Sequence, residues 1–321
     1  MRILITGGAG FIGSHLAEAL VGEGHDISIL DDLSNGTINN LASIHGHYKF
    51  IRGDVAINGT ITKDYEAIFH LACWPRSRSF SDPFRDVEVN INGMVNVLEI
   101  ARRSDAKVIF SSNSGIYGTC KLPITEDSPD DPKTPYDLNK LTAEKYLELY
   151  YKTYGIDYTI FRFATVYGPR QRTSEEWKPV VMEFIDKLSQ GLTPTIYWNG
   201  EQTRDFIYVD DIVKNLVSAL KWTLKGPIIL ATGKETSINE LYDIISRKLN
   251  VAIQPRRAPM VLGDIPRMQY KENGYAQITV EEGINRIMRV RLISSIPTLQ
   301  SFSPTGMRDA EICEDTDKEE E

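Results

Sequence analysis

The sequence predicts an α/β protein in which a doubly wound parallel sheet is joined to a smaller, interleaved α/β lobe. Three observations support this fold class. A glycine cluster at residues 7–13 separates a short apolar run from a helical stretch. Short apolar runs then alternate with longer helical stretches up to about residue 166, which is typical of a parallel sheet with helices on both faces. Beyond that residue the pattern is more mixed, which indicates a second, smaller unit.

The glycine cluster lies between an apolar run at residues 2–6 and a helical stretch at residues 14–21. Gly7, Gly10 and Gly13 permit a sharp backbone turn, the close approach of a pyrophosphate and tight packing of the helix on the strand. Phosphates are favoured at the helix N-terminus, where they meet unpaired N–H groups and the helix dipole. In this setting the cluster indicates a Rossmann dinucleotide site rather than a plain glycine turn.

The remaining elements follow from hydrophobic periodicity. Short apolar runs predict further strands at residues 27–30, 48–51, 67–71, 107–111 and 158–162. Helical patterns predict helices at residues 89–103, 136–154, 179–190, 210–222 and 238–248. Because parallel strands end at one edge of a sheet, we expect the ligand site beyond their carboxyl ends.

These elements divide the chain into two interleaved parts and a tail. We expect a dinucleotide-binding Rossmann domain over residues 1–166, to which residues 205–222 return. The smaller substrate-binding lobe is expected over residues 167–204 and 223–291. Residues 292–321 are expected to form a C-terminal extension with an acidic, disordered end.

The composition excludes several classes of protein. The net charge of the 321 residues is −8, but eight acidic and two basic residues among the last fourteen supply most of it, so no basic field for nucleic acid remains. No apolar run is long enough to span a bilayer, and a strand that begins at residue 2 leaves no room for a signal peptide, so we expect a cytoplasmic protein without membrane contact. Cys73, Cys120 and Cys313 are too far apart for a disulfide framework or a metal site.

Acidic residues follow the second and third predicted strands. Asp31 and Asp32 come about eighteen residues after the last glycine of the cluster, where a carboxylate can accept hydrogen bonds from both hydroxyls of an adenosine ribose and would repel a 2′-phosphate. NAD is therefore favoured over NADP, and the alternative is an acidic turn without a ligand. Asp54, at the end of the next strand, is placed to reach the adenine edge.

Tyr136 and Lys140 lie four residues apart in a predicted helix and therefore share one face. A tyrosine with a pKa of about 10 is a poor base at neutral pH, but a nearby ammonium group and an oxidised nicotinamide both favour its phenolate. By itself the pair also fits an ordinary amphipathic helix. Downstream of a dinucleotide site, it indicates a catalytic tyrosine that takes a proton from a substrate hydroxyl.

With these motifs the chain resembles the extended short-chain dehydrogenase/reductases, and among them the NAD-dependent nucleotide-sugar epimerases and dehydratases. Within that family it is most similar to the UDP-glucose 4-epimerases. The matching motifs are residues 7–13, 31–36, 53–55, 70–72, 90–93, 111–118, 136–140, 167–171 and 204–211.

The resemblance implies a set of site residues. Catalysis would use Tyr136, Lys140 and Ser112, with Lys140 also on the nicotinamide ribose. The residues that would bind NAD are Gly7, Gly10, Phe11, Ile12, Gly13, Asp31, Asp32, Asn35, Gly36, Asp54, Val55, Leu71, Ala72, Cys73, Asn90, Tyr136 and Lys140. The residues that would contact the nucleotide sugar are Asn113, Ser114, Thr165 and Arg204, with the arginine on the diphosphate. No metal is implied.

Several positions depart from the family pattern. Asn113 stands where the family has its catalytic serine or threonine, so Ser112 is predicted as the third catalytic residue and Asn113 as a donor to the sugar 4-oxygen. Thr165 replaces an asparagine that touches the diphosphate, and residues 261–262 lack an expected arginine. Arg76 or a neighbouring arginine on its loop can replace that phosphate contact, the alternative being a solvated loop.

The resemblance implies redox-neutral chemistry in which the sugar is transiently oxidised to a 4-keto sugar. Family dehydratases and decarboxylases place acidic residues in the segment 111–118, and their absence here argues against both reactions. We therefore expect NAD-dependent epimerisation of a nucleotide sugar at C4, of the UDP-glucose/UDP-galactose type, in a homodimer whose seam includes the helix of Tyr136. The alternatives are an NAD-linked nucleotide-sugar reductase or dehydrogenase, and a non-catalytic dinucleotide-binding regulator.

Overall fold

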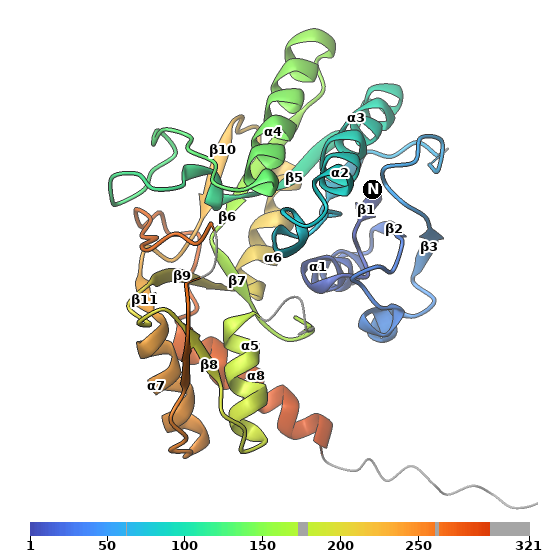
Figure 1. The fold of residues 1–321 in the computed structure, drawn as a ribbon. Helices are drawn as coiled ribbons and strands as arrows, with labels where there is room; N and C mark the ends of the chain where they lie inside the picture. The colour runs from blue at the N-terminus through green and yellow to red at the C-terminus, as the bar shows by residue number, and fades with distance from the viewer. Residues whose placement is uncertain (62, 173–178, 261–262, 296–321) are drawn as a thin grey trace, which may run out of the picture.

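A parallel sheet forms the centre of the molecule (Figure 1). The computed structural model describes residues 1–61, 63–172, 179–260 and 263–295. Within these residues seven strands pair in the order β10-β6-β5-β4-β1-β2-β3, every neighbouring pair being parallel. Their bounds are β1 (Arg2–Thr6), β2 (Asp26–Asp31), β3 (Tyr48–Arg52), β4 (Ala67–His70), β5 (Lys107–Asn113), β6 (Tyr158–Phe163) and β10 (Pro227–Leu230).

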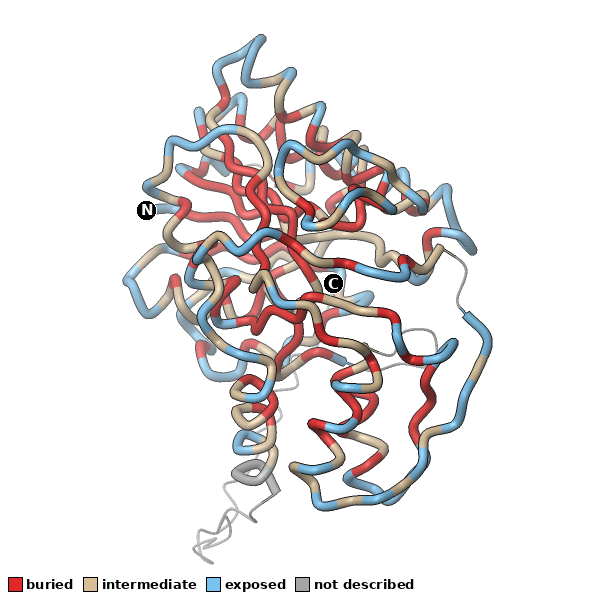
Figure 2. Tube along the Cα trace, turned by 90° about the vertical axis from the view of Figure 1, so that its left-hand side faces the viewer, coloured by how far each residue is buried: buried red, intermediate tan, exposed pale blue. Residues whose placement is uncertain are grey.

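Helices cover both faces of this sheet, because the strands are apolar on both sides. Ile3 and Ile5 of β1 belong to a core that includes α1 (Phe11–Gly22) and α6 (Val209–Ser218). The intervening Leu4 belongs to a second core on the other face, which includes residues of α3 (Gly93–Ser104) and α4 (Pro135–Tyr154). The short α2 (Pro83–Val87) and a π-helical turn (Glu88–Asn92) precede α3. Figure 2 shows the buried strands inside and the exposed residues on the outer elements.

A smaller lobe lies beyond the carboxyl ends of these strands, in the lower part of Figure 1. It has its own apolar core and two small sheets, with strand orders β11-β9-β7 and β12-β8 among the described residues. The strands are β7 (Thr165–Tyr167), β8 (Thr195–Tyr197), β9 (Thr203–Tyr208), β11 (Glu235–Ser237) and β12 (Arg256–Ala258). The helices are α5 (Val180–Ser189), α7 (Ile238–Leu249) and α8 (Val280–Ser295).

The predicted fold class is confirmed, and the boundaries at which the chain crosses between the two parts are shifted from those that the sequence indicated. β10 falls in the range expected for the lobe, yet it pairs with β6 at the edge of the large sheet. β9 falls in the range expected to return to the Rossmann domain, yet it pairs with β7 and β11. Both strands are short, and no local motif assigns them to a sheet. The acidic end of the chain lies outside the described residues.

None of the helices in the described part of the chain is both long and apolar enough to cross a membrane.

Candidate functional site

A cavity of about 730 Å³ opens at the carboxyl ends of the central strands, between the sheet and the smaller lobe. Of the predicted site residues, Asn90 and Lys140 lie behind its wall, and the others line it. The predicted residues that line it are Gly7, Gly10, Phe11, Ile12, Gly13, Asp31, Asp32, Asn35, Gly36, Asp54, Val55, Leu71, Ala72, Cys73, Ser112, Asn113, Ser114, Tyr136, Thr165 and Arg204. The fold therefore brings the cofactor, catalytic and substrate residues of the prediction to one place.

The glycine turn leaves room that any side chain would fill. Gly7 has a φ of +71°, and a Cβ added at Gly13 would lie 2.2 Å from the Gly7 oxygen. Gly10 is the N-cap of α1 and offers no side-chain cap. The helix N-terminus thus faces the cavity with backbone N–H groups, which is the arrangement that binds a pyrophosphate. The cradle fits a dinucleotide.

Asp31 ends β2 and is held by the backbone of two turns. Its two carboxylate oxygens accept hydrogen bonds from the N–H groups of Ala9, at 2.9 Å, and of Leu33, at 2.8 Å. Burial raises the pKa of Asp31, whereas these hydrogen bonds lower it. Each carboxylate oxygen has a second lone pair, so Asp31 can still receive ribose hydroxyls. The neighbouring Asp32 is exposed and accepts from the N–H of Ser34 at 2.9 Å.

The end of the cavity that is predicted to bind adenine contains an arginine, Arg85, that the sequence did not single out. One oxygen of Asp54 accepts from the N–H of Ala56 at 2.8 Å, and the other accepts from Arg85. The guanidinium groups of Arg85 and Arg78 lie 5.9 and 5.4 Å from the ring centre of Trp74, which is cation–π distance. Asp54 thus lies beside a cation, a contact that no sequence motif indicated.

Asn90 supports the cavity wall from behind. It lies in the π-helical turn before α3 and is buried. Its Oδ1 accepts from the N–H of Trp74 at 3.2 Å, and its Nδ2 donates to the Trp74 carbonyl at 3.3 Å. Asn90 therefore fixes the backbone of the loop after β4, which faces the cofactor part of the cavity.

The start of α4 fixes the predicted catalytic helix. Thr134 is its N-cap and accepts from the N–H of Asp137 at 3.1 Å, Pro135 occupies the first turn, and Gly155 ends the helix in the left-handed conformation with φ of +78°. These are the residue types that helix starts and ends favour. The cap therefore sets where Tyr136 enters the cavity.

Tyr136 and Lys140 lie together as predicted. Lys140 is 2% exposed, its Nζ donates to the Ser111 carbonyl at 3.0 Å, and it lies 5.6 Å from the ring centre of Tyr136. Burial lowers the pKa of Lys140. Burial, followed by the neighbouring Cys73 and Asp137, raises the pKa of Tyr136. The phenolate therefore needs positive charge beside it, which an oxidised nicotinamide supplies when bound.

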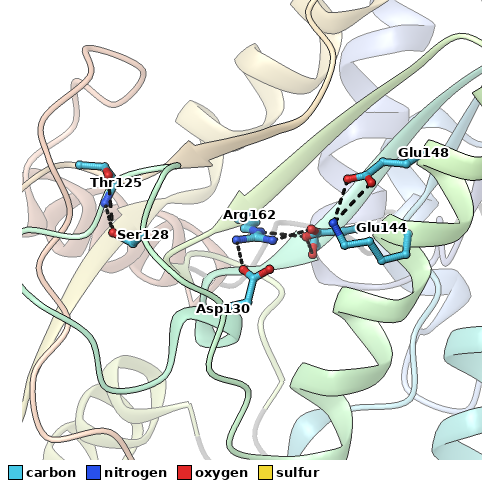
Figure 3. Close-up of polar contacts among 8 residues, drawn as sticks. Thr125, Ser128, Asp130, Glu144, Glu148 and Arg162 are labelled. Atoms are coloured by element: carbon cyan, nitrogen blue, oxygen red, sulfur yellow. Dashed lines mark hydrogen bonds and ion pairs between the residues drawn. The ribbon is translucent and has the colours of Figure 1, made fainter.

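Ser112 belongs to a buried polar network that joins β5, β6 and α4. Figure 3 shows Arg162, Glu144 and Asp130 of this network. Its hydroxyl donates to Glu144, which also binds Arg162 through two hydrogen bonds of 2.9 and 2.6 Å. Arg162 in addition donates to Asp130 at 2.8 Å. Although burial lowers the pKa of Arg162, its contacts with Glu144 raise it overall. Since its proton is used in this network, Ser112 stays a prediction as a catalytic residue.

Asn113 is held by hydrogen bonds to Gly115 and Asp137. Its Oδ1 accepts from the N–H of Gly115 at 3.1 Å, and its Nδ2 donates to Asp137. The next residue, Ser114, is buried and accepts a hydrogen bond of 2.7 Å from Tyr270. The three polar side chains at residues 112–114 are therefore all oriented, Ser112 and Asn113 by residues of α4 and Ser114 by Tyr270.

Arg204 reaches the cavity from β9. Its Nη1 donates to the carbonyls of Thr203 and Ile265, each at 2.7 Å, and its Nη2 pairs with Asp264. Burial lowers the pKa of Arg204, and Asp264 opposes that shift. Thr165, the first residue of β7, lines the same part of the cavity. This end therefore holds a fixed cation, as the predicted diphosphate contact requires.

Known proteins resemble this chain over most of its length. Residues 3–230 match the model of the NAD dependent epimerase/dehydratase family. A putative UDP-glucose 4-epimerase from Methanocaldococcus jannaschii is 38% identical over 301 residues, which cover 89% of this chain and 97% of the relative. Relatives of lower identity are named UDP-glucuronic acid decarboxylases.

Two solved structures illustrate the match in fold. A UDP-N-acetylglucosamine 4-epimerase from Methanobrevibacter ruminantium, in complex with UDP-N-acetylmuramic acid, has a TM-score of 0.85 and 32% identity, with coverage of 91% of this chain and 98% of its own. The UDP-glucose 4-epimerase of Thermus thermophilus, in complex with NAD, has a TM-score of 0.84 and 30% identity, with coverage of 92% and 100%.

Proposed function

We propose that this chain, which belongs to the NAD-dependent epimerase/dehydratase family and uses NAD as its cofactor, epimerises a nucleotide sugar at C4, of the UDP-glucose/UDP-galactose type. The observation that carries the proposal is the pair of Tyr136 and Lys140. A phenol on the wall of a dinucleotide cavity, with a buried ammonium 5.6 Å from its ring centre, is equipped to move the proton of a sugar hydroxyl.

Bound NAD supplies reversible hydride chemistry at C4. Tyr136 Oη takes the proton of the 4-hydroxyl and returns it once the sugar has turned in the site. Lys140 places its positive charge beside the phenol and favours the deprotonated form. Arg204 holds the diphosphate through its guanidinium fork, so that the nucleotide stays in place while the sugar turns.

A hydrogen-bond donor to the sugar 4-oxygen is the third requirement. Ser112 and Asn113 are the two candidates from the end of β5. Asn113 is favoured by geometry, because the Ser112 hydroxyl already donates to Glu144, whereas an amide has a second N–H beyond the one given to Asp137.

The end of β5 also supports epimerisation over its rivals within the family. The cavity-lining residues 112–115 are two serines, one asparagine and one glycine, so this segment supplies no acid that could expel water from the sugar. Of the cavity carboxylates, Asp31 ends β2, Asp32 follows it, Asp54 follows β3, and Asp264 is paired with Arg204.

The test begins with the cofactor. Denaturation of the purified protein should release NAD, because an epimerase that returns the hydride retains its cofactor, whereas a reductase or dehydrogenase exchanges it. Incubation with UDP-galactose should then yield UDP-glucose without added NAD. A non-catalytic regulator would yield none.

Tyr136→Phe tests the assigned base. It should lower kcat by about 10²- to 10⁴-fold with NAD retained. Tyr154→Phe is the matched control, since Tyr154 is 54% exposed at the far end of the same helix and should leave kcat unchanged. Equal activity of Tyr136→Phe and the wild type contradicts the proposed mechanism.

We also propose that the protein forms a homodimer through α2 and α4. Phe84 and Val87 of α2, and Leu138 and Leu149 of α4, are large apolar side chains that are 46–83% exposed. Apolar exposure of this kind on neighbouring helices favours a second copy as the cover. Sedimentation should give a dimer mass, and Leu149→Glu should give a monomer, whereas a monomeric wild type refutes the proposal.

A further inference from the structure

Arg76 occupies a fixed position on the cavity wall. It lies in the loop after β4, and its side chain is 38% exposed. Its Nη2 donates to the Gly263 carbonyl at 2.9 Å, and its Nε lies 3.4 Å from an oxygen of Asp137. A guanidinium has five N–H donors, so these contacts orient the group and leave donors for a ligand.

The partner carboxylate of Arg76 is rigid and lies beside the predicted catalytic residue. Asp137 follows Tyr136 directly in the first turn of α4 and is fully buried. Asn113 donates to the same oxygen that pairs with Arg76. A Cβ added at Gly115 would lie only 2.8 Å from that oxygen, which indicates how closely the carboxylate is packed. Arg76 is therefore held beside the residue that follows the proposed base, Tyr136.

The geometry of a hexose then separates the tasks of the two arginines. In a pyranose ring C4 lies opposite C1, and C1 bears the diphosphate. The neighbours of C4 are C3 and C5. Arg204 is held by Asp264 and by lobe carbonyls, whereas Arg76 is held both by Asp137, next to Tyr136, and by the carbonyl of Gly263, next to Asp264. Arg76 thus lies between the two sides. If Tyr136 meets the 4-hydroxyl, the pair of Arg76 with Asp137 brings the guanidinium toward the C4 side of the ring, where the substituents on C3 and C5 lie.

The two arginines also share one electrostatic environment. After burial, the positive charge of Arg76 is among the causes that lower the pKa of Arg204, and Asp264 opposes them. An anion that binds beside Arg76 reduces the repulsion between Arg76 and Arg204, as does a diphosphate that binds at Arg204. Two arginines therefore act on the same part of the wall, Arg76 paired with Asp137 and Arg204 with Asp264.

We propose that Arg76 determines specificity by binding a carboxylate on the C4 side of the sugar, so that the site accepts and prefers nucleotide sugars with an anionic sugar ring. The inference rests on the proposed C4 epimerisation. The carboxylate is either that of a uronic acid, at C6, or that of an acid ether on O3. Arg76 donates a bidentate, charge-assisted pair of hydrogen bonds to it, while Asp137 and Asn113 position the guanidinium.

The test compares charged and neutral sugars on one nucleotide. For the wild type, Arg76→Gln and Arg76→Lys, kcat/KM is measured with UDP-glucose, UDP-glucuronic acid and UDP-N-acetylmuramic acid, and binding is measured by calorimetry. Arg102→Gln is the matched control, since Arg102 is 45% exposed on α3, where it pairs with Glu99. The wild type should favour one charged substrate over UDP-glucose by about tenfold or more. Arg76→Gln should raise KM for that substrate by about 10- to 100-fold and alter UDP-glucose less than threefold.

The arms distinguish the outcomes. Partial rescue by Arg76→Lys supports binding of a charge, and the identity of the affected substrate tells the C6 carboxylate from the O3 one. Equal losses for neutral and charged sugars place Arg76 on the shared diphosphate and overturn the inference, as does no loss at all. If the wild type turns over none of the three, the proposed epimerisation fails, while calorimetry still decides whether Arg76 discriminates the charged sugars in binding.

Discussion

The cofactor end and the sugar end of the cavity are built from different parts of the chain. At the cofactor end the backbone does most of the positioning: glycines 7, 10 and 13 make the cradle, and Asp31 is held by two backbone N–H groups. At the sugar end side chains do it, through the pairs of Arg76 with Asp137 and Arg204 with Asp264. A backbone site tolerates change poorly but is shared by a whole family, whereas a site of paired side chains can be altered one pair at a time to suit another sugar.

The largest expected effect is in the buried polar network that joins β5, β6 and α4. Glu144→Gln removes the charge that compensates the buried Arg162 (Figure 3) and should lower the free energy of unfolding by about 3–5 kcal/mol. Glu148→Gln, one turn further along α4, breaks only a pair with the exposed Lys145 and should cost about 0–1 kcal/mol. Urea denaturation measures the free energy of unfolding of both variants, and similar values would show that stability does not depend on the pair of Glu144 with Arg162.

The second prediction alters the sugar end alone. Asn113→Ala removes the favoured donor to the sugar 4-oxygen and should lower kcat by about 100-fold, with NAD retained. Ser112→Ala should instead lower the melting temperature and change kcat less than threefold, because its hydroxyl serves Glu144. Stopped assays of both variants, with NAD measured after denaturation, decide between them. A large loss of kcat in Ser112→Ala alone would assign the catalytic role to Ser112.

The sequence predicts local patterns but not the side-chain pairs of the site. The glycine cluster, Asp31 and the helical spacing of Tyr136 and Lys140 are local patterns; the glycines, Asp31 and Tyr136 line one cavity, and Lys140 lies 5.6 Å from the ring centre of Tyr136. The contacts that the sequence did not reveal join residues far apart in the chain.

The missed contacts share one physical cause. Arg85 and Asp54 are 31 residues apart, Arg162 and Glu144 are 18 apart, and Arg204 and Asp264 are 60 apart. No periodicity links such partners, because only the packing of β3, β6 and the lobe against their neighbours brings them together. For the same reason β10 was missed, since a four-residue apolar run does not indicate which sheet it joins.

The third prediction alters the cofactor end alone. Gly13→Ala places a Cβ 2.2 Å from the Gly7 oxygen and should lower stability by about 1–3 kcal/mol and the retained NAD by about tenfold or more. Gly22→Ala is the matched control at the other end of α1, where an added Cβ meets nothing within 4 Å. NAD released per protein chain is the readout. If both variants retain NAD like the wild type, the glycine turn is not the pyrophosphate cradle.

The smallest expected effect concerns His70, which directly precedes the cavity-lining residue Leu71. His70 ends β4, is 1% exposed, lies 2.8 Å from the Thr6 hydroxyl and has its pKa lowered to about 3 by burial, with Lys140 as a further cause. Between pH 6.5 and about 3 the unfolded chain binds a proton at this histidine that the folded chain refuses, so stability falls as the pH falls through that range. His70→Asn should reduce the slope of unfolding free energy against pH by about one proton in that range. Equal slopes for the wild type and His70→Asn would mean that His70 is protonated in the folded protein as readily as in the unfolded chain, and would contradict the low pKa inferred from its burial.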